Sequence, residues 1–158
     1  MGLVRTPSIR IASGLLAFAV AVIGCGTTAT PSPSPAPTSS LVAALPGQTE
    51  TDWGVIWDTL PADFPAYAGA TPADGSAEGP ASGTFVADGD VAADAATWFA
   101  SGSVARVGGS ADTEGPLEDG GYVVHTDGDG GCRIQVTASP IGGVTTITIL
   151  YGGECPNP

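Results

Sequence analysis

The sequence contains no lysine, a single histidine and only four arginines among its 158 residues. Arg5 and Arg10 lie near the N-terminus, which leaves Arg106 and Arg133 to balance all sixteen acidic residues. A chain with this charge repels phosphate groups and anionic lipid headgroups, so the composition argues against nucleic-acid binding. It is compatible with cations, basic proteins and neutral ligands. The acidity alone identifies no ligand, because a GC-rich genome, a saline habitat or a need for solubility gives the same composition.

The sequence also lacks a hydrophobic run long enough to cross a membrane. Its longest apolar stretch covers residues 11–24, whereas a membrane-spanning helix needs roughly 20 residues. Arg5 and Arg10 precede the stretch, no acidic residue does, and small residues stand at its end. This order is typical of a secretory signal peptide.

The apolar stretch ends in Val22-Ile23-Gly24-Cys25, which resembles the lipobox of bacterial lipoproteins. A small residue at the position of Gly24 lets the signal peptidase approach the bond, and the thiol of Cys25 supplies the sulfur for a diacylglycerol group. The resemblance implies cleavage before Cys25 and a lipid anchor on that residue, at the extracytoplasmic face of the cell membrane. The alternative, a plain cleaved signal, leaves a reactive thiol exposed outside the cell.

The segment after the cysteine is rich in proline, serine, threonine and alanine and poor in bulky apolar residues. Such a composition favours extended polyproline II structure and predicts a disordered stalk. At roughly 3.1 Å per residue, about 20 extended residues would hold a domain some 60 Å from the bilayer. The sequence therefore predicts a signal peptide over 1–24, a lipidated cysteine and linker over 25–50, and one small acidic globular domain over 51–158.

Within the domain, three segments near the C-terminus have the alternating pattern of β-strands. They cover about 121–126, 132–138 and 144–151, and glycine-rich turns join them. The pattern predicts an antiparallel meander. A further strand is expected over 82–87.

Two helices are expected beside these strands. One begins after Asp90, which stands where an N-cap belongs, and ends near 101–103 or at the Gly108-Gly109 pair. A shorter one is expected over 53–60, because four large apolar residues recur there at helical spacing. The predicted fold is α+β, a β-α-β-β-β meander packed by one or two helices.

The two cysteines of the domain are expected to form a disulfide. Pairing Ile134 with Ile149 places Cys132 opposite Tyr151, and the glycine pair that follows can fold the chain back to bring Cys155 within reach. An exported domain lies where disulfides persist. With one of three cysteines lipidated, two remain to pair.

Several strings of the domain, WDTLPADFPAYAGA, GPLEDGG, GDGGCRIQV and ITILYGGECP, resemble a loosely defined group of small secreted lipoproteins from GC-rich bacteria. The likeness covers most of the domain. Its motifs are turns, a helix cap and paired cysteines, so the resemblance implies an extracytoplasmic address and supplies no functional residue.

The sequence offers few combinations of residues that could form a catalytic or metal-binding site. His125 is the only histidine, and it is expected to point outward while Cys132 points inward, which argues against a Cys-His dyad. A structural zinc site needs four Cys or His ligands, and the domain has only three such residues. Asp127 and Asp129 are weak candidates for calcium, with an Asp-Gly turn as the simpler interpretation. No cofactor is expected.

We therefore expect a non-catalytic binding domain, tethered to the membrane by Cys25, for a surface protein or small ligand. The alternatives are a small secreted enzyme or enzyme inhibitor, and a calcium-dependent surface module. The candidate binding surface is the row of side chains expected on the outward face of the meander: His125, Arg133, Gln135, Thr137, Thr146 and Thr148.

Overall fold

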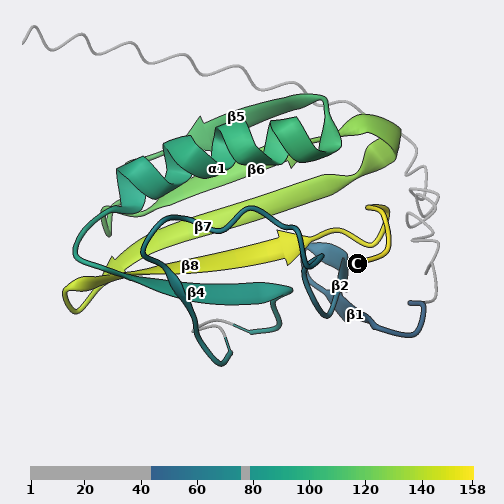
Figure 1. Cartoon of the computed structure of the whole chain (residues 1–158), viewed down its shortest axis with the longest axis horizontal. Coiled ribbons are helices and arrows are strands. Elements are labelled where there is room, and N and C mark those ends of the chain that lie inside the picture. Colours follow the sequence, from purple (N-terminus) through teal and green to yellow (C-terminus); the bar gives the residue numbers. More distant parts are fainter. Residues whose placement is uncertain (1–43, 76–78) are drawn as a thin grey trace, which may run out of the picture. The chain divides into compact units, whose positions relative to one another are not determined.

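A computed structural model describes residues 44–75 and 79–158 of the chain (Figure 1). The predicted signal peptide, Cys25 and most of the predicted linker lie outside these residues. The fold is α+β, as predicted: an antiparallel sheet of six strands, a two-stranded hairpin and one α-helix in the described part.

The six-stranded sheet has the order β3-β4-β8-β7-β6-β5. Every neighbouring pair is antiparallel. Its three central strands are those with the strongest alternation of apolar and polar residues. The strands of this sheet are β3 (Thr71–Pro72), β4 (Gly83–Asp88), β5 (Ser110–Glu114), β6 (Tyr122–Asp127), β7 (Arg133–Ile141) and β8 (Val144–Tyr151).

Helix α1 (Ala92–Val107) packs on one face of the sheet, against β5, β6 and β7 (Figure 1). It runs on to Gly108, the longer of the two expected lengths. The predicted N-cap is wrong: Val91 occupies the cap position, and no side chain caps the helix. Instead Thr145 of β8 fixes the start, since its Oγ1 accepts a hydrogen bond from the Val91 N–H at 2.9 Å and donates one to the Gly89 carbonyl at 2.8 Å.

The segment 58–70 lies on the same side of the sheet as α1. Leu60 and Phe64 pack against the core from this segment, and the ring of Phe64 meets that of Tyr151 edge to face, with centroids 6.0 Å apart. The buried core therefore lies between the sheet on one side and α1 with this segment on the other. Its largest fully buried side chains are Tyr151, Phe99, Ile56, Ile134, Ile147 and Ile149.

The predicted helix over 53–60 is wrong, because these residues form a hairpin of β1 (Gln48–Thr51) and β2 (Gly54–Trp57). Gly54, at φ +134°, lies at the turn. The hairpin is a separate two-stranded sheet, and an isolated bridge between Ile56 and Gly152 links it to the residue that follows β8. Tertiary contacts thus outweigh the helical spacing of the apolar residues. The first strand also begins at Gln48, ahead of the domain start expected at residue 51.

The meander differs from the prediction in one strand and in register. Strand β5 was not predicted. It follows α1 in the sequence and pairs with β6 at the edge of the sheet. Ile134 lies opposite Tyr151 rather than Ile149, a shift of two residues. The tight turn at Gly142-Gly143 sets this register, because it places Ile141 opposite Val144. A shift of two residues leaves every side chain on its predicted face.

Candidate functional site

The six predicted surface residues lie on one face of the sheet. His125 of β6 is opposite Gln135 of β7, and Thr137 of β7 is opposite Thr148 of β8. Side chains alternate between the two faces of a strand, so residues an even number of positions away on the same strand share the face. By this rule Arg133 shares the face with Gln135, and Thr146 shares it with Thr148. We call these six the sheet-face residues.

No helix of the described residues covers this face. Helix α1 buries Ala95 and Phe99 in the core cluster, which contains Val124, Val136 and Ile149 from the other face of the sheet. All but one of the sheet-face residues are half-buried by their neighbours, and Arg133 is exposed. The face is therefore a partly exposed β-surface without a helix over it in the described part of the chain.

Hydroxyl groups dominate the centre of this face. Thr84 of β4, Thr148 of β8 and Thr137 of β7 stand side by side across three strands. The next row holds Thr146 and, opposite it, Ser139. Directly opposed side chains on a sheet lie about 5 Å apart at Cβ, so each row holds regularly spaced hydroxyl groups. Thr84 is buried, so the hydroxyl groups that reach the surface are those of β7 and β8.

Acidic side chains stand at the margins of the same face. Asp112 of β5 is opposite His125 and Glu114 is opposite Val123, and Asp127 is opposite Arg133 at the strand end. The face thus combines a neutral hydroxyl-rich centre with an acidic edge along β5.

Arg133 marks one end of the face together with Trp53, a residue that the sequence analysis assigned to a core helix. The guanidinium carbon of Arg133 lies 5.0 Å from the centroid of the Trp53 ring, a cation–π contact. Trp53 is half-buried beside the hairpin turn. The β1–β2 hairpin places Trp53 beside Arg133. Because a helix was predicted for this segment, the contact between Trp53 and the candidate surface was not predicted.

The disulfide between Cys132 and Cys155 is present. Cys132 is 1% exposed and belongs to the core cluster, whereas His125 lies on the opposite face of the sheet. With its sulfur bonded to Cys155, Cys132 offers no thiolate. The two residues therefore do not form a dyad.

The calcium candidates Asp127 and Asp129 flank a turn at the end of β6. Asp129 begins the short 3₁₀ helix η1 (Asp129–Gly131), in which Gly130 has φ +69°. Its carboxylate lies beside Gly108 at the end of α1. Within residues 44–75 and 79–158, no group of three or more His, Cys, Asp or Glu side chains is arranged to hold a metal ion.

A charged cluster that the sequence analysis missed lies on the helix side of the sheet. Arg106 of α1 forms an ion pair with Asp63, with 2.8 Å between Nη1 and Oδ2, and its guanidinium lies 5.9 Å from the centroid of the Phe64 ring. The hydrogen bond from Arg106 lowers the pKa of Asp63. The same bond raises the pKa of Arg106, and the nearby Tyr151 hydroxyl adds to this effect.

The ion pair borders a cavity of about 420 Å³ that the disulfide also lines. Tyr151 is fully buried, and its hydroxyl makes no hydrogen bond with another described residue. No sequence pattern indicated the cluster, because its members are 43 residues apart and meet only when the segment 58–70 crosses the sheet.

The chain matches no protein-family model, no curated protein and no solved structure. None of the helices in the described part combines the length and apolar character that a membrane span requires. The interpretation of the sheet face therefore rests on the residues of this chain alone.

Proposed function

We propose that the protein is a lipoprotein anchored through Cys25 to the extracytoplasmic face of the cell membrane, and that its C-terminal domain binds a partner there without catalysis. The uncovered sheet face is the proposed binding surface. The observation that carries this proposal is the gathering of all six sheet-face residues on the one face that α1 does not cover.

Two features of the chain support the extracytoplasmic address. The first is the sequence of a charged start, a short apolar run and a lipobox-like end at Cys25. The second is the bond between Cys132 and Cys155, since disulfides form and persist in oxidising compartments. The proline-rich segment between these features is a suitable spacer.

The character of the face suits a small partner or a reversible contact. Four strands at about 4.8 Å spacing and about seven residues at 3.3 Å rise give a flat area of roughly 450 Å², less than the roughly 800 Å² per partner of a stable protein interface. Among the described residues, the large apolar side chains that are exposed are Leu45, Leu117 and Ile141, and of these Ile141 alone belongs to strands β4 and β6–β8. The face therefore offers hydroxyl groups for hydrogen bonding beside the half-buried apolar side chains of Val86, Val123 and Leu150, which the register places on the same face.

Site-specific photo-crosslinking in cells tests this surface. A photoreactive residue replaces Thr137 at the centre of the face, and in a matched control it replaces Ala93, which is exposed on α1. We expect a discrete adduct from position 137 and none from position 93. Adding Thr148→Arg beside position 137 should abolish the adduct, because a long cation then occupies the hydroxyl row.

Two outcomes contradict the proposal. One is the same adducts from positions 93 and 137, which would indicate random collisions. The other is an adduct at position 137 that survives Thr148→Arg unchanged, because Thr148 lies directly opposite Thr137.

A further inference from the structure

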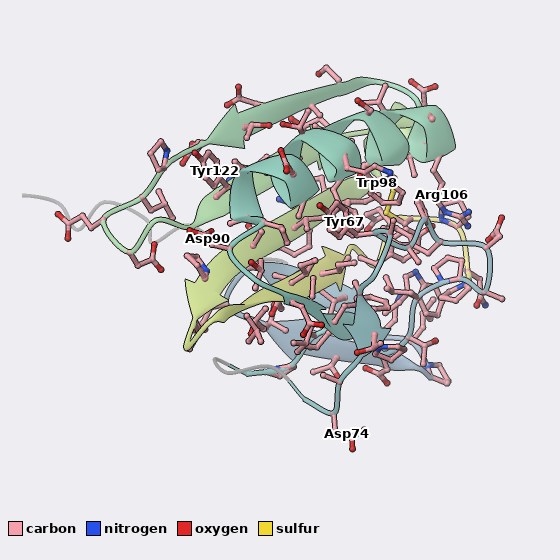
Figure 2. All side chains as sticks on the ribbon, turned by 60° about the vertical axis from the view of Figure 1, so that its left-hand side comes forward. Tyr67, Asp74, Asp90, Trp98, Arg106 and Tyr122 are labelled. Carbon is pink, nitrogen blue, oxygen red and sulfur yellow. A yellow bond between two sulfur atoms is a disulfide. The ribbon has the colours of Figure 1, made fainter. Side chains whose placement is uncertain are left out.

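A shallow groove of about 630 Å³ lies between α1 and the segment that leads to β3. It is on the helix side of the sheet and therefore separate from the sheet-face residues. Figure 2 shows Tyr67 and Trp98 next to each other at this place. The groove is lined by Tyr67, Asp94, Thr97, Trp98, Ser101 and Gly102.

Two aromatic rings form the apolar part of the groove. Tyr67 and Trp98 meet edge to face, with ring centroids 6.0 Å apart and an interplanar angle of 82°. Trp98 also packs edge to face against the buried Phe99, with centroids 4.9 Å apart. Trp98 is thus held from two sides but only half-buried, which leaves aromatic surface open to a ligand.

Gly102 lies on the floor of the groove, next to Pro65 and Trp98. A Cβ atom at this position would lie 3.4 Å from Cγ of Pro65 and 3.8 Å from the Trp98 ring. These are ordinary van der Waals distances, so a methyl group at this position would line the floor of the groove without displacing Pro65.

The oxygen atoms that line the groove are available as hydrogen-bond acceptors. Thr97 donates its hydroxyl proton to the Ala93 carbonyl at 3.0 Å, and Ser101 donates its own to the Thr97 carbonyl at 3.4 Å. The carboxylate of Asp94 only accepts when ionised. In the described part of the chain Asp94 has no ion-pair partner, since the ion pair found there joins Arg106 and Asp63. Aromatic faces and acceptor oxygens together favour a ligand with positive charge and N–H donors.

We propose that this groove binds a small organic ammonium ion, a primary amine carried on a short alkyl chain. The ammonium group donates to Asp94 and to the hydroxyl oxygen of Thr97, which lies one turn further along the same face of the helix. The alkyl chain and the charge lie against Tyr67 and Trp98, where a cation is attracted to the ring faces. The excess of acidic residues in the chain also favours a positively charged ligand. The groove's volume is that of a small-molecule site.

Titration of the full chain in a non-ionic detergent with n-butylammonium at pH 7 tests the proposal, with the indole N–H signal of Trp98 followed by NMR. We expect a saturating shift of this signal at millimolar concentrations. The same concentrations of 1-butanol, which has the alkyl chain without the charge, should leave the signal in place. An equal response to 1-butanol, or no response to either compound, overturns the proposal.

Two substitutions and a matched control locate the site. Asp94→Asn and Tyr67→Leu should each weaken butylammonium binding about fivefold, the loss expected for one exposed ion pair or cation–π contact. Asp112→Asn removes the same charge from exposed β5 and should leave binding unchanged. If Asp112→Asn weakens binding as much as Asp94→Asn, the ion is attracted by overall charge alone and the proposed site is wrong.

Discussion

The sulfur atoms of Cys132 and Cys155 join the residue before β7 to the segment that follows β8, across 23 positions of the chain. Cys155 also accepts, at its carbonyl oxygen, a hydrogen bond of 3.1 Å from Nε1 of Trp57. The bond therefore holds the C-terminal segment between the sheet and the β1–β2 hairpin. A small core gains much from such a crosslink, because it restricts the unfolded chain.

Replacing both cysteines, Cys132→Ala with Cys155→Ala, should lower the free energy of unfolding by about 3 kcal/mol, the loop-closure value for a crosslink of this span. Urea unfolding of the full chain in detergent, followed by tryptophan fluorescence, measures the change. Reduction of the wild-type protein should give a similar loss. A double variant as stable as the oxidised wild type would show that the bond does not stabilise the fold.

The ion pair between Asp63 and Arg106 should make stability depend on pH at the acid end. Because the folded state lowers the pKa of Asp63, the pair stabilises the fold above the ordinary carboxyl pKa of about 4. This contribution is lost as the pH falls through the lowered pKa. The urea midpoint of Asp63→Asn should therefore lie below that of the wild type at pH 7, and the difference should shrink toward pH 2.

Asp74→Asn is the control for this pH dependence. Asp74 is exposed, and Figure 2 shows it on a loop away from Arg106. This substitution should leave the midpoint at pH 7 close to that of the wild type. A pH profile of Asp63→Asn that runs parallel to the wild-type profile from pH 7 to pH 2 would contradict the role given to the pair.

Alternation of side chains was enough to predict the central sheet and its faces. Ile134, Val136 and Ile149 are 0–1% exposed, and the hydroxyl residues between them lie on the other face. The predicted pairing was two residues out of register, yet the faces were correct, because only an odd shift exchanges them. The exact register depends on the glycine turn before Val144, which the pattern of the strands does not contain.

The spacing of Trp53, Ile56 and Trp57 predicted a helix where the chain forms a hairpin. Their spacing fits one face of a helix, and nothing local excludes it. The hairpin depends on distant partners: the Ile56 bridge to Gly152 and the hydrogen bond from Trp57 to Cys155. Contacts of this kind, about 100 residues away, cannot be deduced from a short window.

Neither strand β5 nor the groove beside Trp98 was predicted from the sequence, because neither has a local pattern that indicates it. The sequence of β5, SADTE, has charged and small residues in place of the β-branched alternation of a central strand. Such a strand suits a sheet edge, where charge prevents pairing with other chains. The groove needs Tyr67 from one segment and Trp98 from another, and neither segment alone indicates that they meet.

The turn between α1 and β5 should tolerate no side chain at Gly109. Gly109 has φ +75°, and a Cβ there would overlap the carbonyl oxygen of Asp127. Gly142, at φ +62°, has open space around the same position. Gly142→Ala should therefore cost about 1 kcal/mol for its backbone conformation, and Gly109→Ala about 2 kcal/mol more because the strand end must move. Thermal unfolding of both variants measures the difference, and equal losses would contradict the close packing of this turn.

The turn that carries Asp127 and Asp129 should form without calcium. No third acidic ligand is gathered with these two carboxylates among the described residues. Adding calcium to 1 mM should therefore leave the melting temperature of the full chain unchanged, and calorimetry should record no binding heat. A site with a dissociation constant of about 1 µM would instead stabilise the fold by about 4 kcal/mol at this concentration. Such a rise, lost in Asp129→Asn, would favour the calcium-dependent module.

The lipid anchor is the claim on which the proposed address and the role of the proline-rich segment depend. Intact mass spectrometry of the protein extracted from the membranes of cells that express the full chain tests it most directly. We expect a chain that begins at Cys25 and carries the added mass of a diacylglycerol group, and Cys25→Ser should abolish both the cleavage and the added mass. A chain that still holds residues 1–24, or one that begins at Cys25 without acyl groups, would show that Cys25 does not anchor the protein.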